Sequence, residues 1–242
     1  MSANVTPYDD QERGKKEQVT QMFDTIANEY DGLNRVISLG IDTKWRKRLV
    51  KLVKEKQPEK ILDIATGTGD LAIALAETGA EQIIGLDISK GMLEVGQKKI
   101  VAKNLDKTIQ MVLGDGEHLP FDNNYFDAIT IAFGVRNFED LEQGLKEILR
   151  VLKPGGILAV LETSVPTKTP IKQGYFLYTR YIVPLIGRLF SRDRNAYAYL
   201  SESAAAFPHG KAFNNILGKI GFIGMENKPQ SLGVASIYIA SK

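Results

Sequence analysis

The sequence predicts an α/β fold in which helices cover both faces of a mostly parallel sheet. Between residues 61 and 161, short apolar runs typical of buried strands alternate with amphipathic helical patterns. A glycine-rich turn at residues 66–69 joins the first run to a helix, as in strand–turn–helix units. Residues 232–240 alternate in character and end the chain, which indicates an antiparallel edge strand.

We expect five parallel strands and a carboxyl-terminal hairpin, which together make a seven-stranded sheet. The expected strands are 61–65, 82–87, 109–113, 126–133, 157–161, 221–222 and 232–240. Helices are expected at 70–77, 90–99 and 141–152, with Ser89 as the N-cap of the second. The Lys153-Pro154-Gly155-Gly156 sequence should stop the third helix. Strands that alternate with helices in this way pair in parallel with right-handed crossovers.

The chain before the first strand has two parts. Residues 1–16 are polar and include Pro7 and Gly14, so we expect a mobile tail, followed by a single domain over residues 17–242. Apolar spacing predicts a helix from residue 17 to 30 and, after residues 30–34, a short loop region followed by a second helix at 44–54. These helices belong to no strand–helix–strand unit. They either pack against the sheet or form a lid, residues 17–57, over a ligand site.

Residues 165–218 separate the fifth strand from the hairpin, and this is more chain than one crossover helix requires. The segment is rich in large side chains, and residues 165–195 contain six basic residues against one acidic residue, a surplus of +5. We expect an inserted helical segment. Two interpretations remain open: it shelters a greasy ligand or rests on anionic lipid, or it is a buried cap or the partner surface of a homodimer.

Composition excludes several kinds of site. The 242 residues include no cysteine and two histidines, so disulfides, thiolate metal sites and a histidine-rich metal centre are not expected. A net charge of +2 is too mild to indicate a nucleic-acid partner. We find neither a run of about 18 apolar residues nor a signal-peptide core. We therefore expect a cytoplasmic protein, with peripheral contact at the inner face of the membrane as an open alternative.

Three stretches predict an adenosine-containing ligand. Gly67, Thr68 and Gly69 form a turn whose backbone N–H groups point toward a ligand at a helix N-terminus. Asp87 ends the second strand 20 positions after Gly67, where a carboxylate holds two ribose hydroxyls. Asp115 and Gly116 follow the third strand and can read an adenine amino group and ring nitrogen. That pair favours S-adenosylmethionine over a dinucleotide. The alternatives are a solvated strand-end aspartate and a plain Gly-Asp-Gly turn.

These features resemble class I S-adenosylmethionine-dependent methyltransferases, which have a Rossmann-like fold. Three longer stretches, residues 30–38 with Trp45, residues 133–137 and residues 150–164, are similar to the ubiquinone/menaquinone biosynthesis C-methyltransferase family. Residues 199–203 with Phe207-Pro208 continue the match, which covers nearly the whole chain beyond the tail. The departures are Leu33 for the usual Met, Asp42 for the usual His, and Asp115-Gly116 for Asn-Ala.

The resemblance implies ligand contacts at Thr68, Asp87, Asp115 and Gly116. It also implies S-adenosylmethionine as cofactor, with methylation of a ring carbon of a prenylated quinol, most of all demethylmenaquinol.

The acceptor should lie beyond the fourth strand, where the sequence places Arg136 and Asn137. We expect Arg136 to stabilise the phenolate that activates the ring carbon and to polarise a water that takes the proton. Asn137 and Tyr30 are its expected orienting partners. The alternative for Arg136 is a surface salt bridge. This chemistry requires no metal. Naphthoquinol and benzoquinol acceptors both remain open.

Other functions remain possible on this fold. An enzyme that methylates exocyclic base nitrogens would carry an Asn/Asp-Pro-Pro-aromatic loop after the fourth strand, where this chain has Phe133-Gly134-Val135-Arg136-Asn137. A nicotinamide-dependent oxidoreductase is disfavoured because Ala72 replaces the third glycine of the dinucleotide motif. A different small-molecule methyltransferase and a scaffold without activity are the remaining alternatives.

Overall fold

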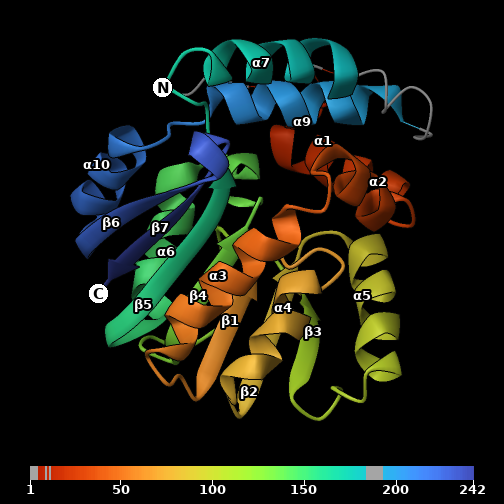
Figure 1. The fold of residues 1–242 in the computed structure, drawn as a ribbon. Helices are drawn as coiled ribbons and strands as arrows, with labels where there is room; N and C mark the ends of the chain where they lie inside the picture. Colours follow the sequence, from red (N-terminus) through yellow and green to blue (C-terminus); the bar gives the residue numbers. More distant parts are fainter. Residues whose placement is uncertain (1–4, 9, 11, 184–192) are drawn as a thin grey trace.

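A seven-stranded sheet forms the centre of the protein in the computed structural model (Figure 1), which describes residues 5–8, 10, 12–183 and 193–242. The strand order is β3-β2-β1-β4-β5-β7-β6. The strands are β1 (Lys60–Ile64), β2 (Gln82–Asp87), β3 (Ile109–Leu113), β4 (Phe126–Ala132), β5 (Leu152–Thr163), β6 (Ile223–Gln230) and β7 (Ala235–Ser241). Strands β1 to β5 pair in parallel, and β7 pairs antiparallel with β5 and β6. The expected fold class is therefore confirmed.

Helices cover both faces of this sheet. One face packs against α3 (Asp42–Lys54), α4 (Asp70–Leu75) and α5 (Lys90–Ala102). The other face packs against α6 (Leu141–Val151) and α10 (Lys211–Ile220). Because both faces are covered, the central strands read as continuous apolar runs such as Ile83-Ile84-Gly85-Leu86, all of which are buried.

A third layer lies across the carboxyl ends of the parallel strands, at the top of Figure 1. It consists of α1 (Lys15–Ile26), α2 (Tyr30–Ile37), α7 (Ile171–Leu177) and α9 (Arg194–Ala206). A π-helical turn, η3 (Tyr178–Ile182), continues α7. Residues of α1, α2 and α9 form a separate apolar cluster with Met92 of α5. Ligands of open α/β sheets bind at this edge, so the third layer covers the expected site.

Several boundaries differ from the sequence-based expectation. Strand β5 begins at Leu152 and includes Lys153-Pro154-Gly155-Gly156, although α6 does stop at Val151 as expected. The first hairpin strand is Ile223–Gln230 and not 221–222, because Gly221, at φ 117°, ends α10. The second strand begins at Ala235, after a short 3-10 turn, η4 (Ser231–Gly233).

The amino-terminal prediction also needs correction. Helix α2 runs from Tyr30 to Ile37 and so extends into the loop region expected after residues 30–34, and α1 begins at Lys15, inside the stretch expected as a tail. The Tyr8 N–H donates to Gln18 of α1 at 3.0 Å. Residues 1–4, 9 and 11 of that stretch, and residues 184–192 of the inserted segment, lie outside the described residues. Within the described ranges, we find no helix of the length and apolar character needed to cross a membrane.

Candidate active site

Two strained turns meet where β1 and β4 end. Ala65 and Phe133 have left-handed backbones, at φ 51° and 59°, and such non-glycine residues each cost about 1–3 kcal/mol. Gly134 follows Phe133, and a Cβ at Gly134 would lie 2.4 Å from the Ala65 Cβ. The two turns therefore pack too closely for any larger residue at position 134. Ala65 and Phe133 line the first of two neighbouring cavities, and Phe133 also lines the second.

The first cavity, which we call the donor cavity, contains four of the six residues predicted to bind the cofactor: Gly67, Asp87, Asp115 and Gly116. Its volume is about 80 Å³, which is small beside the roughly 300–1,000 Å³ of most ligand pockets. Residues Lys16, Val19 and Phe23 of α1 form one wall. The present position of α1 therefore limits the space for a ligand.

Asp87 is a buried carboxylate on the wall of the donor cavity. Its Oδ2 accepts the Gly67 N–H at 2.7 Å, and its Oδ1 accepts the Ser89 N–H at 2.8 Å. Burial raises the pKa of the Asp87 carboxyl to about 6, although these N–H groups oppose the shift. Gly67 is left-handed at φ 56°, and nothing lies within 4 Å of the place where its Cβ would be. A ligand can thus approach this backbone beside a buried carboxylate.

Thr68 and Gly69 are not among the residues that line the donor cavity. Gly69 is the left-handed N-cap of α4. The Thr68 hydroxyl donates to Asp31 of α2 at 2.5 Å, and Lys99 Nζ contacts Asp31 at 2.7 Å. Thr68 therefore fixes α2 against the glycine turn in this structure.

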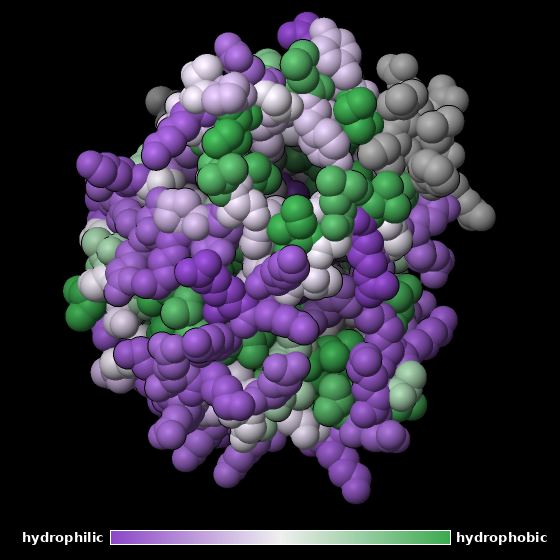
Figure 2. Space-filling model, viewed as in Figure 1, coloured by the Kyte–Doolittle hydropathy of each residue, from purple (hydrophilic) through white to green (hydrophobic). Residues whose placement is uncertain are grey.

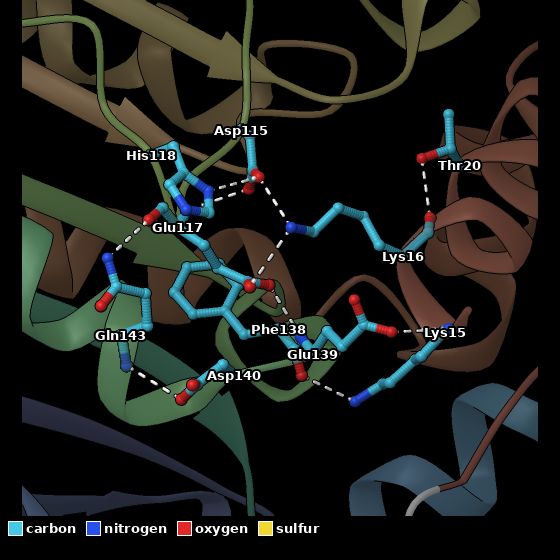
Figure 3. Close-up of polar contacts among 10 residues, drawn as sticks. All are labelled: Lys15, Lys16, Thr20, Asp115, Glu117, His118, Phe138, Glu139, Asp140 and Gln143. Atoms are coloured by element: carbon cyan, nitrogen blue, oxygen red, sulfur yellow. Dashed lines mark hydrogen bonds and ion pairs between the residues drawn. The ribbon is translucent and has the colours of Figure 1, made fainter.

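Asp115 forms an ion pair that reaches across the donor cavity. Figure 3 shows Lys16 extending from α1 so that its Nζ lies 2.7 Å from Asp115 Oδ2 and 3.3 Å from Glu117 Oε2. The His118 ring lies 3.1 Å from the same Asp115 oxygen. The Lys16 ammonium lowers the pKa of Asp115, even though partial burial acts in the opposite direction. The oxygen expected to accept an adenine amino group is thus held by α1.

The neighbouring Lys15 ties α1 to the turn after β4. Its Nζ donates to the Phe138 carbonyl at 2.8 Å and to the Arg136 carbonyl at 3.1 Å, and its N–H donates to Glu139 at 2.8 Å. Helices α1 and α2, which belong to the segment expected either to pack on the sheet or to form a lid, thus contact the glycine turn, the Asp115 loop and the Arg136 loop.

The second cavity, which we call the acceptor cavity, has a volume of about 540 Å³. Its walls are mostly apolar and come from α2, α3, α7, η3 and α9. Tyr30 and Phe133 line both cavities, so the two spaces meet at these rings. Burial raises the pKa of the Tyr30 phenol, and the phenol therefore stays neutral at ordinary pH.

Arg136 lines the acceptor cavity, where it forms a buried ion pair with Glu162 at the end of β5. The Arg136 Nη1 donates to Glu162 Oε1 at 2.6 Å and to the Phe133 carbonyl at 2.8 Å, and its Nε donates to Ser203 at 3.3 Å. The Arg136 side chain is 6% exposed and the Glu162 side chain 0% exposed. Arg136 thus lies in a buried polar cluster and not in a surface salt bridge.

The expected partners of Arg136 occupy other positions. Asn137 lines the donor cavity, and its Oδ1 accepts the Tyr199 hydroxyl at 3.1 Å. Tyr30 lines both cavities, whereas the Arg136 side chain donates to Ser203, Phe133 and Glu162 within the described residues. Glu162 was not predicted as a site residue. The available signal was an acidic residue at the end of a strand, as with Asp87, within the stretch 150–164 that carried the family resemblance.

Comparison with known proteins agrees with this geometry. Residues 11–242 match the model of the ubiE/COQ5 methyltransferase family. The chain belongs to the ubiE/COQ5 methyltransferase family. It is therefore a methyltransferase with S-adenosylmethionine as its cofactor, and the buried carboxylate and open glycine of the donor cavity fit the ribose and backbone contacts of that molecule.

Relatives of this methyltransferase include proteins named demethylmenaquinone methyltransferase. One from Bacteroides fragilis is 44% identical over 239 residues, which cover 98% of this chain and 97% of the relative. One from Porphyromonas gingivalis is 41% identical over 240 residues, with 98% of each chain covered. One from Bacillus cereus is 42% identical over 233 residues, with 96% and 98% covered.

Solved structures share the fold at lower identity. An S-adenosylmethionine-dependent methyltransferase from Thermotoga maritima superposes with a TM-score of 0.64 at 20% identity, covering 92% of this chain and 99% of that one. The cyclase SpnF superposes with a TM-score of 0.57 at 22% identity, covering 94% and 96%. Because one neighbour is a cyclase, the fold alone does not decide the reaction.

Proposed function

We propose that this methyltransferase methylates a ring carbon of demethylmenaquinol, the reduced form of the substrate in its relatives' names. The observation that supports the proposal is the large apolar acceptor cavity, which meets the donor cavity at Tyr30 and Phe133 and has the buried Arg136 side chain in its wall. A quinol ring with a prenyl tail needs apolar walls and a polar partner for its hydroxyl. The cavity offers both.

The chain's residues would bind the two ligands as follows. Asp87 would accept hydrogen bonds from the ribose hydroxyls. Once Lys16 has moved away from Asp115, the Asp115 carboxylate would accept from the adenine amino group and the Gly116 N–H would donate to a ring nitrogen. Gly67, Thr68 and Gly69 form the turn that receives the rest of the cofactor. When bound, S-adenosylmethionine supplies an electrophilic methyl group on a positively charged sulfur.

On the acceptor side, the ring carbon becomes nucleophilic when the neighbouring hydroxyl loses its proton to a water molecule. Arg136 lines the cavity, and its Nη2 forms no hydrogen bond with any residue in the described ranges. That nitrogen is available to stabilise the developing phenolate, a type of contact worth about 10²–10³ in rate. Tyr30 lines both cavities and Asn137 lines the donor cavity, where the two side chains would exclude water from the reacting carbon.

The experiment uses methyl-labelled S-adenosylmethionine with demethylmenaquinol and, separately, with the demethylated benzoquinol of ubiquinone biosynthesis. Mass analysis of the lipid extract should show label on the naphthoquinol ring. Label on the benzoquinol alone would reassign the protein to the ubiquinone branch, and no label on either would defeat the proposal.

We also propose that the inserted segment contacts the inner face of the cytoplasmic membrane, from which a prenylated acceptor would enter. Phe176, Leu177, Tyr181 and Ile182 are exposed on α7 and η3. Figure 2 shows hydrophobic side chains gathered at the top of the molecule, around a hollow. Lys168, Lys172 and Arg180 are basic residues of the same segment, which suits anionic headgroups.

Sedimentation with vesicles that contain about 30% anionic lipid tests the membrane contact. The double change Phe176→Ser and Leu177→Ser should reduce binding. Val101→Ser, an exposed apolar residue on α5, serves as the matched control and should not. Wild-type protein that stays in solution and elutes as a dimer, dissociated by the double change, would assign this face to a second copy instead.

A further inference from the structure

Glu162 is a buried carboxylate in which one oxygen accepts several hydrogen bonds and the other accepts none within the described residues. Its Oε1 accepts Arg136 Nη1 at 2.6 Å, the Thr163 N–H at 2.8 Å and the Thr163 hydroxyl at 3.1 Å. Its Oε2 is buried and has no hydrogen-bond partner in the described structure. An unpaired buried acceptor is costly, so a position that retains one invites a functional explanation.

The contacts at Oε1 decide how the guanidinium is turned. Nη1 is held by Glu162 and by the Phe133 carbonyl, and Nε is held by Ser203. The remaining nitrogen, Nη2, is left for a ligand in the acceptor cavity. Glu162 is itself fixed by Thr163 at the end of β5, and β5 pairs with β4, the strand that precedes Arg136. The orientation of Arg136 is thus set by the sheet and not by a flexible surface contact.

The charges around Glu162 are few, so its own charge matters. The groups that face it are Arg136 from η2 (Val135–Asn137), Tyr175 from α7, Tyr199 from α9 and Tyr238 from β7. Burial raises the pKa of all three phenols, which leaves them neutral at ordinary pH. Arg136 and Glu162 therefore form a net neutral pair, and an ionised acceptor oxygen becomes a second anion that shares the same guanidinium.

We propose that Glu162 is a positioning residue for methyl transfer, which holds Arg136 with Nη2 free for the acceptor and limits how readily the acceptor hydroxyl ionises. This inference rests on the proposed function. It has two consequences of opposite sign. Loss of the carboxylate misplaces Arg136 and lowers the maximal rate. The same loss removes a nearby negative charge, so the acceptor hydroxyl ionises at lower pH.

The test is the pH dependence of the single-turnover rate with demethylmenaquinol and saturating S-adenosylmethionine. In Glu162→Gln the plateau should fall about 100-fold, as when one oxyanion donor is lost. The rise of the rate with pH should move about one pH unit lower. Affinity for S-adenosylhomocysteine should stay within about threefold of wild type, because Glu162 does not line the donor cavity. In Glu162→Asp, which keeps the charge, the rise should stay at the wild-type pH while the plateau falls.

Glu202→Gln on the exposed side of α9 is the matched control for loss of a negative charge and should change neither quantity. A wild-type plateau and an unmoved pH profile in Glu162→Gln would overturn the proposal. So would a lower plateau that is explained by unfolding, with the pH profile unmoved. If Glu162→Gln does not fold, a wild-type rate in Glu162→Asp would overturn it. Wild-type protein that methylates neither quinol defeats the proposed function and this inference together.

Discussion

Replacing Asp87 by Asn tests the donor cavity most directly. The Gly67 and Ser89 N–H groups donate to separate carboxylate oxygens and the Ile88 N–H also acts on this carboxylate, so the lone pairs that remain can accept a ribose hydroxyl. A hydrogen bond to a charged group contributes about 1.5–3 kcal/mol. The Asn amide keeps one acceptor oxygen and has no charge. We therefore expect a loss of about 3 kcal/mol, or roughly 100-fold in affinity for S-adenosylhomocysteine.

The stability of the ligand-free protein should change much less, because two effects oppose each other. The rise of the Asp87 pKa from 3.8 to about 6 corresponds to a destabilisation of about 3 kcal/mol at neutral pH, which a neutral Asn relieves. In return, the Asn NH₂ faces one of the two backbone N–H groups and leaves it unpaired, at a cost of about 1–3 kcal/mol. The melting temperature should therefore stay close to that of the wild type.

Isothermal titration with S-adenosylhomocysteine measures the affinity, and calorimetric melting measures the stability. Asp122→Asn, at an exposed loop position outside both cavities, is the control and should bind like wild type. An Asp87→Asn protein that binds within threefold of wild type would refute the role given to this carboxylate. Weaker binding that is matched by a large loss of melting temperature would attribute the effect to folding instead.

Three further predictions concern the same two cavities. The carboxylate is the form of Asp87 that binds ribose. Affinity for S-adenosylhomocysteine should therefore be constant above the Asp87 pKa of about 6 and fall as the pH drops below that value. Titrations between about pH 5 and about pH 8, in steps of about one pH unit, should show this fall in wild type and not in Asp87→Asn. In stopped-flow binding, Lys16→Met should speed the association of the cofactor and weaken the salt dependence of the association rate, because no ammonium then pairs with Asp115. Association rates that equal those of wild type at all salt concentrations would contradict this. Arg136→Met should lower the single-turnover rate at least about 100-fold with little change in affinity for S-adenosylhomocysteine, and equal losses in both would argue against the role of Arg136. The single change leaves the Glu162 carboxylate buried without its partner, so the double variant Arg136→Met, Glu162→Leu is measured beside it.

The central sheet could be predicted because the apolar sequence of each central strand reflects its burial. A parallel strand that is covered on both faces must be apolar throughout, and its carboxyl end must adjoin a turn and a helix. That rule located β1 and β2 to within one residue. Asp87 could be found for the same reason, since the length of one strand–helix–strand unit fixes its distance from the glycine turn.

The elements that were missed owe their structure to their neighbours. Strand β6 has the sequence Ile-Gly-Met-Glu-Asn-Lys-Pro-Gln and is largely exposed, so its pairing with β7 and not its own pattern makes it a strand. Lys16 and Asp115 are 99 positions apart, and Arg136 and Glu162 are 26 apart on different elements. Sequence spacing cannot show such contacts, because they depend on how α1 crosses the sheet edge and on which strands are adjacent.

Tyr30 and Phe133 each belong to the walls of both cavities, whereas Tyr175 of α7 and Leu200 of α9 border the acceptor cavity alone. A substitution at either shared ring would alter the binding of both the cofactor and the acceptor. We therefore expect fewer amino acids to be tolerated at these two positions. The residues of α7 and α9 that line only the acceptor cavity affect one recognition event each. Diversification toward new acceptors in this lineage should therefore accumulate on α7 and α9, while the shared rings stay the same.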